Sequence, residues 1–376
     1  MRFPEFSGEW EKFRLQDVCS FYSGGTPSST QKNFYNGEIP FIRSGEIHSE
    51  TTELTLTQEG LNNSSAKLVK EGDLLLALYG ATSGDIAISQ INGAINQAIL
   101  CIRSKHNNQF IKSTWVKHCS HILQVYLQGG QGNLSAEIVK KLKFSFPNNK
   151  EQKKIADFVS LLEDRIATQI KIIEKLESLI RGISNNLLYS ESGTPVRLGD
   201  ILSERSERTK VNNQHEVLSS TVKGIFSQRE YFSKDIASEN NVGYKVIRLH
   251  DVVLSPQNLW MGNINYNDKF DIGIVSPSYK IFSIADGYDK RFIAAMLKTH
   301  RALYNYMLVS EQGASVVRRN LNMEAFEQLV FKMPPIDKQR EIGNAISALQ
   351  SRLELAVRTK TAYEKQKQWL LTEMFI

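Results

Sequence analysis

The sequence predicts an α+β protein made of two mixed α/β domains, each followed by a long helix. Two observations predict this. The 376-residue sequence repeats itself in register, and an amphipathic pattern with helical spacing closes each repeat. A repeat period close to half the chain indicates duplicated domains rather than a stack of short units.

The clearest part of the repeat lies at the end of each half. Asn133 aligns with Asn320 at an offset of 187 positions (133 to 320), and the same offset holds without a gap over the following residues. The matching pairs are Leu134/Leu321, Glu137/Glu324, Leu142/Leu329, Phe144/Phe331, Pro147/Pro334, Gln152/Gln339, Ile155/Ile342, Leu162/Leu349 and Arg165/Arg352. Two further registers match 73–86 with 251–264 and 14–18 with 197–201, at offsets of 178 and 183 positions. Because the offsets differ, we expect a shared scaffold that carries loops of different length.

Each repeat ends in a predicted helix with one apolar seam. The first helix spans residues 151–188, begins after Pro147 with Asn148 or Asn149 as N-cap and is roughly 57 Å long at about 1.5 Å per residue. Its seam comprises Ile155, Phe158/Val159, Leu162, Ile166, Ile170/Ile173, Leu176, Ile180, Ile183 and Leu187. The second helix follows Pro334-Pro335 with Asp337 as a cap, and its seam comprises Ile342, Ile346, Leu349, Leu353, Ala356, Tyr363, Leu370 and Met374. A single seam on each helix favours an antiparallel coiled coil between them, and separate docking on partner proteins is the alternative.

The rest of each repeat mixes strand and helix patterns. Apolar runs predict strands at 74–79, 86–89, 252–254 and 280–284, whereas helical spacing predicts helices at 109–128 and 289–309. The Ser/Gly/Pro-rich segment 190–195 is a linker. The predicted domains are 1–146 and 191–334, followed by helical segments 147–190 and 335–376.

Composition limits the classes of function. The chain carries 46 Lys+Arg against 40 Asp+Glu, which gives a net charge of +6 and fits a polyanionic partner. Three cysteines are too few for a disulfide framework, the N-terminus has no apolar signal core, and the longest apolar run is too short to span a bilayer. We therefore expect a cytoplasmic protein without a membrane partner.

The motifs of catalysis are missing from the sequence. It has no Walker A or GxGxxG string and no Asn/Asp-Pro-Pro-aromatic motif of an adenine methyltransferase. Met333-Pro334-Pro335-Ile336 lacks both the amide or carboxylate and the aromatic residue, and Glu151-Gln152-Lys153 begins a helix without an acidic partner. His118, Cys119 and His121 have no second pair to complete a zinc site. We expect no catalytic, cofactor-binding or metal-binding residue in this chain.

Several short motifs follow one another along the chain, and the last of them is repeated in the second half. They are Phe21-Tyr22-Ser23-Gly24-Gly25-Thr26-Pro27, Glu71-Gly72-Asp73-Leu74-Leu75, Gly130-Gln131-Gly132-Asn133-Leu134 and the helix start Pro147…Glu151-Gln152-Lys153-Lys154-Ile155 with its echo at 334–342. Over essentially its whole length the chain resembles the specificity subunits of type I restriction-modification systems. It departs from that pattern at 311–321, where a longer segment replaces the compact Gly-Gln-Gly-Asn-Leu form, so contacts need not transfer one to one between the halves.

The resemblance implies a function. Each variable domain would be a target-recognition domain that reads one half of a bipartite double-stranded DNA target, and the helices would set the unread spacer. Two methyltransferase subunits would dock on the helices and methylate adenine at N6 with S-adenosylmethionine held on the partner. Restriction/translocase subunits would add cleavage.

Polar loop residues are the candidates for DNA contact, because Arg, Lys, Asn, Gln, Ser and Thr read base edges and glycine-rich backbone suits phosphates. In the first half they are Ser23, Gly24, Gly25, Thr26, Arg43, Ser44, Tyr79, Gly80, Thr82, Ser83, Gln128, Gln131 and Asn133. In the second half they are Arg205, Arg208, Lys210, Gln257, Asn258, Trp260, Asn263, Arg318, Arg319 and Asn320. The strand-loop-strand segments 73–88 and 251–266 are favoured, because their flanks match while their loops differ. Trp260 either stacks or covers a core edge, and the recurrence of Asn133 and Asn320 favours a structural or phosphate role for both.

Two other functions stay open at this point. One is a coiled-coil adaptor that binds only proteins, and the other is a self-sufficient DNA-modifying enzyme with a divergent site. Salt-insensitive or absent DNA binding would favour the adaptor, and turnover of a methyl donor by the purified chain would favour the enzyme.

Overall fold

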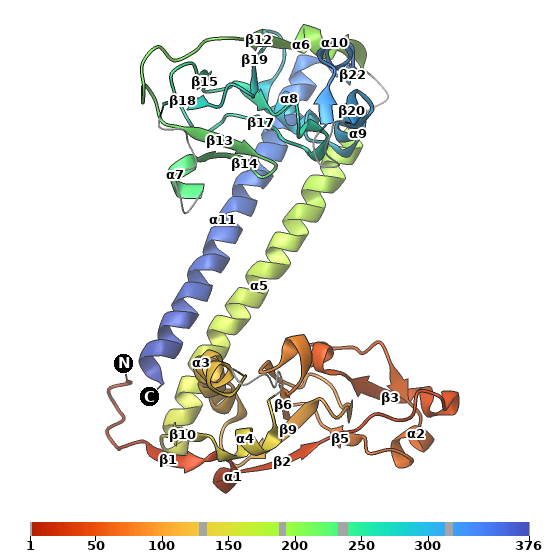
Figure 1. Cartoon of the computed structure of the whole chain (residues 1–376), viewed down its shortest axis with the longest axis vertical. Helices are drawn as coiled ribbons and strands as arrows, with labels where there is room; N and C mark the ends of the chain where they lie inside the picture. Colours follow the sequence, from red (N-terminus) through yellow and green to blue (C-terminus); the bar gives the residue numbers. More distant parts are fainter. Residues whose placement is uncertain (1, 128–133, 188–192, 232–239, 313–318, 376) are drawn as a thin grey trace. The chain divides into compact units, whose positions relative to one another are not determined.

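The computed structural model describes residues 2–127, 134–187, 193–231, 240–312 and 319–375 (Figure 1). The chain divides into two compact units. Unit 1 comprises Met1–Ile170 and Arg358–Ile376, and unit 2 comprises Lys171–Val357. Each unit therefore contains one mixed α/β domain and a segment of each long helix. Among the helices formed by the described residues, none combines the length and apolar character needed to cross a membrane.

The described residues of the α/β part of unit 1 form ten strands. The strands are β1 (Glu11–Arg14), β2 (Cys19–Ser23), β3 (Tyr35–Ile42), β4 (Thr55–Leu56), β5 (Lys67–Val69), β6 (Leu74–Ala77), β7 (Ile86–Ile88), β8 (Gly93–Ile95), β9 (Ile99–Ser104) and β10 (Lys143–Phe146) in the described residues. The helices are α1 (Leu15–Val18), α2 (Gln58–Asn62), α3 (Asn108–Leu127) and α4 (Ala136–Lys141), with 3₁₀ turns η1 (Lys32–Phe34), η2 (Ser44–Glu46) and η3 (Gly80–Thr82).

The α/β part of unit 2 shares only part of this element order. Its described strands are β11 (Thr194–Arg197), β12 (Leu202–Arg205), β13 (Leu218–Thr221), β14 (Gly224–Ser227), β15 (Lys245–Arg248), β16 (Val252–Leu254), β17 (Ile264–Tyr266), β18 (Ile272–Val275), β19 (Lys280–Ile284), β20 (Ser310–Gln312), β21 (Arg319–Leu321) and β22 (Val330–Met333). Its helices are α6 (Leu198–Ile201), α7 (Gln228–Tyr231), α8 (Lys290–Met296), α9 (His300–Leu308) and α10 (Met323–Glu327), with the 3₁₀ turn η4 (Leu259–Met261).

The duplicated topology confirms the predicted fold class. Each unit contains an antiparallel four-stranded sheet, with order β2-β9-β6-β7 in unit 1 and β12-β19-β16-β17 in unit 2. Each unit also pairs its first strand with the strand that precedes the long helix, as β1–β10 and β11–β22. The units differ in the remaining strands, because β4-β3-β8-β5 forms a second sheet in unit 1 while β13–β14 and β15–β18 are separate pairs in unit 2. A common scaffold thus carries different insertions.

The long helices α5 (Asn149–Leu187) and α11 (Ile336–Met374) are 39 residues each. Within each unit, segments of the two helices lie side by side (Figure 1). In unit 1 the helices run antiparallel, because Glu163 bonds Lys367 at 2.6 Å while Arg165 lies 5.7 Å from the ring centroid of Tyr363. In unit 2, Ile183 packs against the core that contains Ile342 and Ile346.

The predicted seams are largely the buried faces of these helices. Among the described positions of α5, the observed seam departs from the predicted one at Ile170. This side chain is 39% exposed, and the neighbouring Gln169 is half-buried in its stead. The reason is the 3.5-residue spacing of a paired helix, which continues from Ile166 through Gln169 to Ile173.

The segment 289–309, which was predicted to be helical, forms two helices and not one. The chain there forms α8 and α9, separated at 297–299. Thr299 begins the second helix as its N-cap, since its Oγ1 accepts a hydrogen bond from Ala302 N at 3.3 Å. The apolar spacing continues across this break, so periodicity alone gave no sign of it.

The helix starts reveal a duplicated hydrogen-bonding motif. Asn148 caps α5, as one of the two predicted candidates, because its Oδ1 accepts from Glu151 N at 3.0 Å. The predicted cap Asp337 instead lies inside the first turn of α11, which begins at Ile336. In the first turn of each long helix, a buried glutamine donates a hydrogen bond to the carbonyl of the proline that precedes the helix. Gln152 donates to Pro147 O at 2.7 Å, and Gln339 donates to Pro334 O at 2.8 Å.

The same glutamines also accept hydrogen bonds from the residues that cap helices α3 and α8 of the α/β domains. Gln152 Oε1 accepts from Asn107 N at 3.3 Å, and Gln339 Oε1 accepts from Asp289 N at 3.0 Å. Asn107 and Asp289 in turn cap α3 and α8 through Phe110 N and Phe292 N. Each glutamine therefore ties a long helix to the α/β domain through two backbone groups, of which the proline carbonyl is buried and the amide part-buried.

We predict that Gln339→Leu destabilises unit 2 by about 1–3 kcal/mol for each backbone group left without a partner. Leucine has similar volume but can neither donate to Pro334 nor accept from Asp289. Urea unfolding, with hydrogen exchange at the first turn of α11, measures the loss. The matched control is Gln350→Leu at an exposed site on the same helix, with an expected change within about 0.5 kcal/mol. Equal effects of the two substitutions would contradict the role of Gln339.

Candidate DNA interface

In unit 1 the favoured loop connects β6 with β7. It contains η3, where Gly80 adopts a positive φ of 78°, and it exposes Tyr79. Ser83 closes the turn by donating its hydroxyl to Leu78 O at 3.0 Å. Leu134 N donates to the same carbonyl at 3.0 Å, so the chain that follows 128–133 is anchored beside this loop. Thr82 lies in the same turn and is half-buried.

In unit 2 the equivalent loop connects β16 with β17 through η4. Arg319 N donates to Gln257 O at 3.1 Å, which repeats the anchoring seen in unit 1. The Arg319 guanidinium lies 4.7 Å from the ring centroid of Trp260, a cation–π contact. Two candidate segments separated by about sixty residues therefore meet, and the shared anchor occurs in both units. Asn258 is half-buried in this loop, while Gln257 and Asn320 are exposed.

The β12 side of unit 2 contributes a second group of candidates. Arg205 is held by Asp251 at 3.0 Å and by Glu207 at 3.1 Å. Burial raises the pKa of the Asp251 carboxyl, and Arg205 opposes that rise. By contrast, no carboxylate within the described residues pairs with Arg208, which donates to the carbonyl of Gly243 at 2.8 Å, and Lys210 is exposed. Arg205 is thus neutralised by carboxylates, whereas Arg208 keeps its charge for an outside anion.

Arg43 is neutralised in the same way in unit 1. It bonds Glu46 at 3.0 Å and also pairs with Glu53. These hydrogen bonds raise the pKa of the Arg43 guanidinium. Ser44 is half-buried at the start of η2 beside this cluster.

The glycine pair after β2 packs against backbone. A Cβ at Gly24 would lie 1.7 Å from Ile95 O, and one at Gly25 would lie 2.5 Å from Ser65 Cβ. Glycine is therefore required by close packing at both positions. Ser23 ends β2 opposite Leu100, and Thr26 is exposed.

Asn263 is also enclosed by protein. Its Oδ1 accepts from Ser220 Oγ at 2.9 Å, its Nδ2 donates to Ser220 O at 3.1 Å, and the residue is buried. The side chain therefore joins the β13–β14 hairpin to the β16–β17 loop. We propose that Asn263 positions this loop, and that the exposed neighbours carry the DNA contacts.

Four candidates, Gln128, Gln131, Asn133 and Arg318, lie outside the described residues. Within the described part of the chain, no group of three or more His, Cys, Asp or Glu side chains is arranged to hold a metal ion. Cys119 donates to Gly84 O at 3.3 Å, and His118 stacks on Phe144 with ring centroids 5.7 Å apart.

A lysine-lined pocket next to this interface was not predicted from the sequence. Lys298 contributes to it. In the alignment of the two repeats that pairs Asn107 with Asp289, Val116 is the unit 1 residue that corresponds to Lys298. A charged residue opposite an apolar one was the only available signal, and such differences are common between diverged repeats.

Comparison with known proteins agrees with the fold and the repeat. Residues 7–178 match the family model described as the type I restriction modification DNA specificity domain. The chain is 24% identical over 191 residues to the type I restriction enzyme MjaIX specificity subunit of Methanocaldococcus jannaschii, a match that covers 47% of this chain and only 43% of that subunit. It is 21% identical to the MjaVIII specificity subunit of the same organism, over 99% of this chain and 92% of that one.

A solved structure extends the likeness in fold to the full chain. The S subunit of a type I restriction-modification system from M. genitalium superposes with a TM-score of 0.66 at 13% identity, covering 100% of this chain and 99% of that one. The chain is therefore similar to type I restriction-modification specificity subunits, in sequence over residues 7–178 and in fold over its full length.

Proposed function

We propose that this chain is the sequence-specific DNA-recognition subunit of a type I restriction-modification complex and performs no catalysis itself. The observation that carries the proposal is the repeated anchoring of two loops at one place on a shared scaffold. In both units the chain before α4 or α10 is held against the β6–β7 or β16–β17 loop, at 3.0 Å and 3.1 Å. The loop residues differ between the units, as expected of two readers with different targets.

The proposal assigns one target-recognition domain to 1–146 and the other to 191–334. Each would read one half of a bipartite double-stranded DNA target, and the helical segments 147–190 and 335–376 would set the spacer. In unit 2 the exposed residues Gln257 and Asn320 and the half-buried Arg319 are the proposed contacts, with Arg208 and Lys210 on the β12 side. In unit 1 they are Tyr79, Gly80, Thr82 and Thr26.

The helices offer surfaces for partner subunits. Large apolar side chains remain exposed on both helices, among them Leu161 at 60%, Leu179 at 44%, Leu355 at 65% and Trp369 at 50%. Exposed apolar side chains along a helix favour a protein partner. We propose that two methyltransferase subunits, which would hold S-adenosylmethionine, dock there, and that restriction/translocase subunits complete the complex.

We predict that the complex of this chain with its methyltransferase subunit selects two short DNA sequences separated by a constant gap. Selection from a randomised duplex library, followed by sequencing, measures this directly, with the methyltransferase subunit alone as control. Binding should weaken steeply with salt, because Lys and Arg displace counterions from DNA. A complex that assembles but selects no sequence would support the protein-only adaptor. Methyl transfer by this chain alone would support the self-sufficient enzyme.

A further inference from the structure

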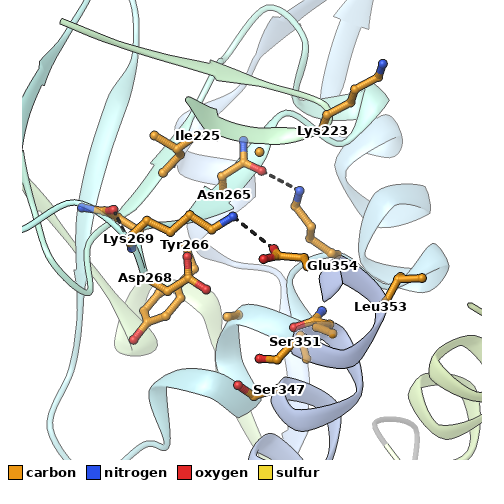
Figure 2. Close-up of a pocket in the computed structure, with 16 residues that line it drawn as sticks. Lys223, Ile225, Asn265, Tyr266, Asp268, Lys269, Ser347, Ser351, Leu353 and Glu354 are labelled. Atoms are coloured by element: carbon orange, nitrogen blue, oxygen red, sulfur yellow. Dashed lines mark hydrogen bonds and ion pairs between the residues drawn. The ribbon is translucent and has the colours of Figure 1, made fainter. Parts of the chain in front are cut away.

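Unit 2 contains a pocket of about 410 Å³ beside α11 (Figure 2). Its walls come from the β13–β14 hairpin, the end of β17 and the segment after it, the region of α8, and the face of α11 that carries Ser347 and Ser351. Figure 2 shows these two serines on successive turns, on the same side of α11 as Glu354. The volume falls within the range of ligand-binding pockets.

Lys298 provides the positive charge inside this pocket. Its ammonium donates to Asn265 Oδ1 at 2.5 Å and to Val222 O at 3.4 Å. No carboxylate within the described residues forms an ion pair with it. Burial lowers the pKa of Lys298 to about 8. The residue as a whole remains exposed, so this cation, which has no carboxylate partner among the described residues, is open to an incoming anion.

The bonded partner of Lys298 is itself held in place. Asn265 is buried, and its Nδ2 donates to Ser220 Oγ at 2.7 Å and to Thr221 O at 2.8 Å. Its Oδ1 must therefore face the pocket, where it accepts from the ammonium. Lys269 lines the same pocket and pairs with Glu354 at 3.1 Å, so its charge is already balanced.

The equivalent place in unit 1 is filled by an ion-paired cluster. Glu163 bonds Lys112 at 2.9 Å and Lys367 at 2.6 Å. Burial acts to raise the pKa of Glu163, but the two lysines outweigh it and the pKa lies below its ordinary value. In the repeat registers, Ala294 and Gln350 of unit 2 stand where Lys112 and Glu163 stand in unit 1. The shared scaffold therefore does not require the pocket of unit 2.

The pocket adjoins the candidate DNA interface. Val222, whose carbonyl accepts from Lys298, also lies beside Gly262, where an added Cβ would approach Val222 Cγ1 to 3.9 Å. Gly262 closes the η4 turn that carries Trp260. Val222 thus lies between the ammonium of Lys298 and the proposed base-reading loop.

We propose that this pocket binds a backbone phosphate of the DNA flanking the half-target read by unit 2, with Lys298 as its cationic donor. The hydroxyls of Ser347 and Ser351 supply neutral donors for the remaining phosphate oxygens. Such a contact strengthens binding to any sequence and carries no sequence information. This inference rests on the proposed function, because it requires that unit 2 binds DNA.

The test is the salt dependence of DNA binding by the complex with its methyltransferase subunit, in phosphate-free buffer. We expect Lys298→Met to weaken binding to target and non-target duplexes by the same factor, about 10-fold at low salt, and to reduce the salt slope by about 1. Lys298→Arg, which keeps the charge, should retain the slope. The control Lys175→Met removes the same charge from an exposed site on α5 in the same unit and should leave the slope unchanged.

Three results would overturn the inference. One is an unchanged salt slope for Lys298→Met in a complex that still selects its target. Another is that inorganic phosphate or a mononucleotide stabilises the wild-type chain but not Lys298→Met, while neither ligand affects DNA binding. That result would assign the pocket to a free phosphate ligand. The third is a complex that binds no DNA, which would remove the proposed function together with this inference.

The pH dependence gives a second readout. As the pH rises through about 8, Lys298 loses its proton and with it the phosphate contact. Lys223, Asp268, Lys269 and Glu354 are the other charged groups lining the pocket. Between pH 7 and pH 9, taken as roughly one unit either side of that pKa, wild-type affinity should fall more than that of Lys298→Met. Parallel curves would contradict the assignment.

Discussion

Replacing Arg319 by alanine is expected to reduce discrimination at one base pair of one half-target by about 10- to 100-fold, while the other half-target is read as before. An arginine that contacts a base edge contributes about 1–3 kcal/mol of discrimination. Arg319 is suited to that role, because its backbone is anchored on Gln257 and its guanidinium is oriented by Trp260 at 4.7 Å. Competition binding with duplexes that vary one base pair at a time measures the loss.

The matched comparison for this prediction is Arg43→Ala in unit 1. The charge of Arg43 is already balanced by Glu46 and Glu53, so its removal should change discrimination far less. Arg319→Lys should give an intermediate result, because lysine keeps the charge but lacks the planar fork that matches a guanine edge. If Arg319→Ala instead weakened all duplexes equally, Arg319 would be a phosphate contact and not a base reader.

Trp115→Ala is expected to destabilise unit 1 by about 3–5 kcal/mol, the usual effect of removing a large buried aromatic side chain. Trp115 is only 1% exposed and lies in the main core of unit 1. Its Nε1 donates to Gly84 O at 2.8 Å, directly after the loop proposed to read DNA. Since whole domains are stable by about 5–15 kcal/mol, this loss is a large fraction of the total.

Thermal and urea unfolding measure the effect of Trp115→Ala, and two variants serve as comparisons. Trp115→Phe retains most of the buried surface but leaves Gly84 O with one donor fewer, so a smaller loss is expected. Trp369→Ala, at a tryptophan that is 50% exposed on α11, should lower stability by less than about 1 kcal/mol. Similar losses for Trp115→Ala and Trp369→Ala would show that α3 does not support the core as described.

The long helices and the repeated strands could be predicted from the sequence because each has a clear period. Seam positions such as Ile155 and Leu370 are buried as expected, and β16 and β19 begin and end where the apolar runs do. The second sheet of unit 1 was not predicted. Its strand β3 contains Asn36, Gly37 and Pro40, which weaken a strand pattern, and β4 and β5 are only two and three residues long.

The candidate site was only partly predictable, because charge and exposure depend on contacts that are distant in sequence. The residue type of Arg43 and Arg205 suggested DNA contact, yet their carboxylate partners became visible only in the fold. Asn263 similarly has the chemistry of a base reader but is buried against Ser220. The meeting of Trp260 with Arg319 could be anticipated only in part, since both belonged to candidate loops but nothing in the sequence paired them.

The most direct test of the account is a domain exchange read out by methylome sequencing. Cells would carry the methyltransferase subunit with either this chain or a version in which residues 194–333 come from one of the specificity subunits that it resembles. We expect a bipartite N6-methyladenine motif in which the exchange replaces one half, while the other half and the gap remain unchanged. A motif that changes in both halves, or a stable complex that methylates no bipartite motif, would contradict the claim that each unit reads one half of the target.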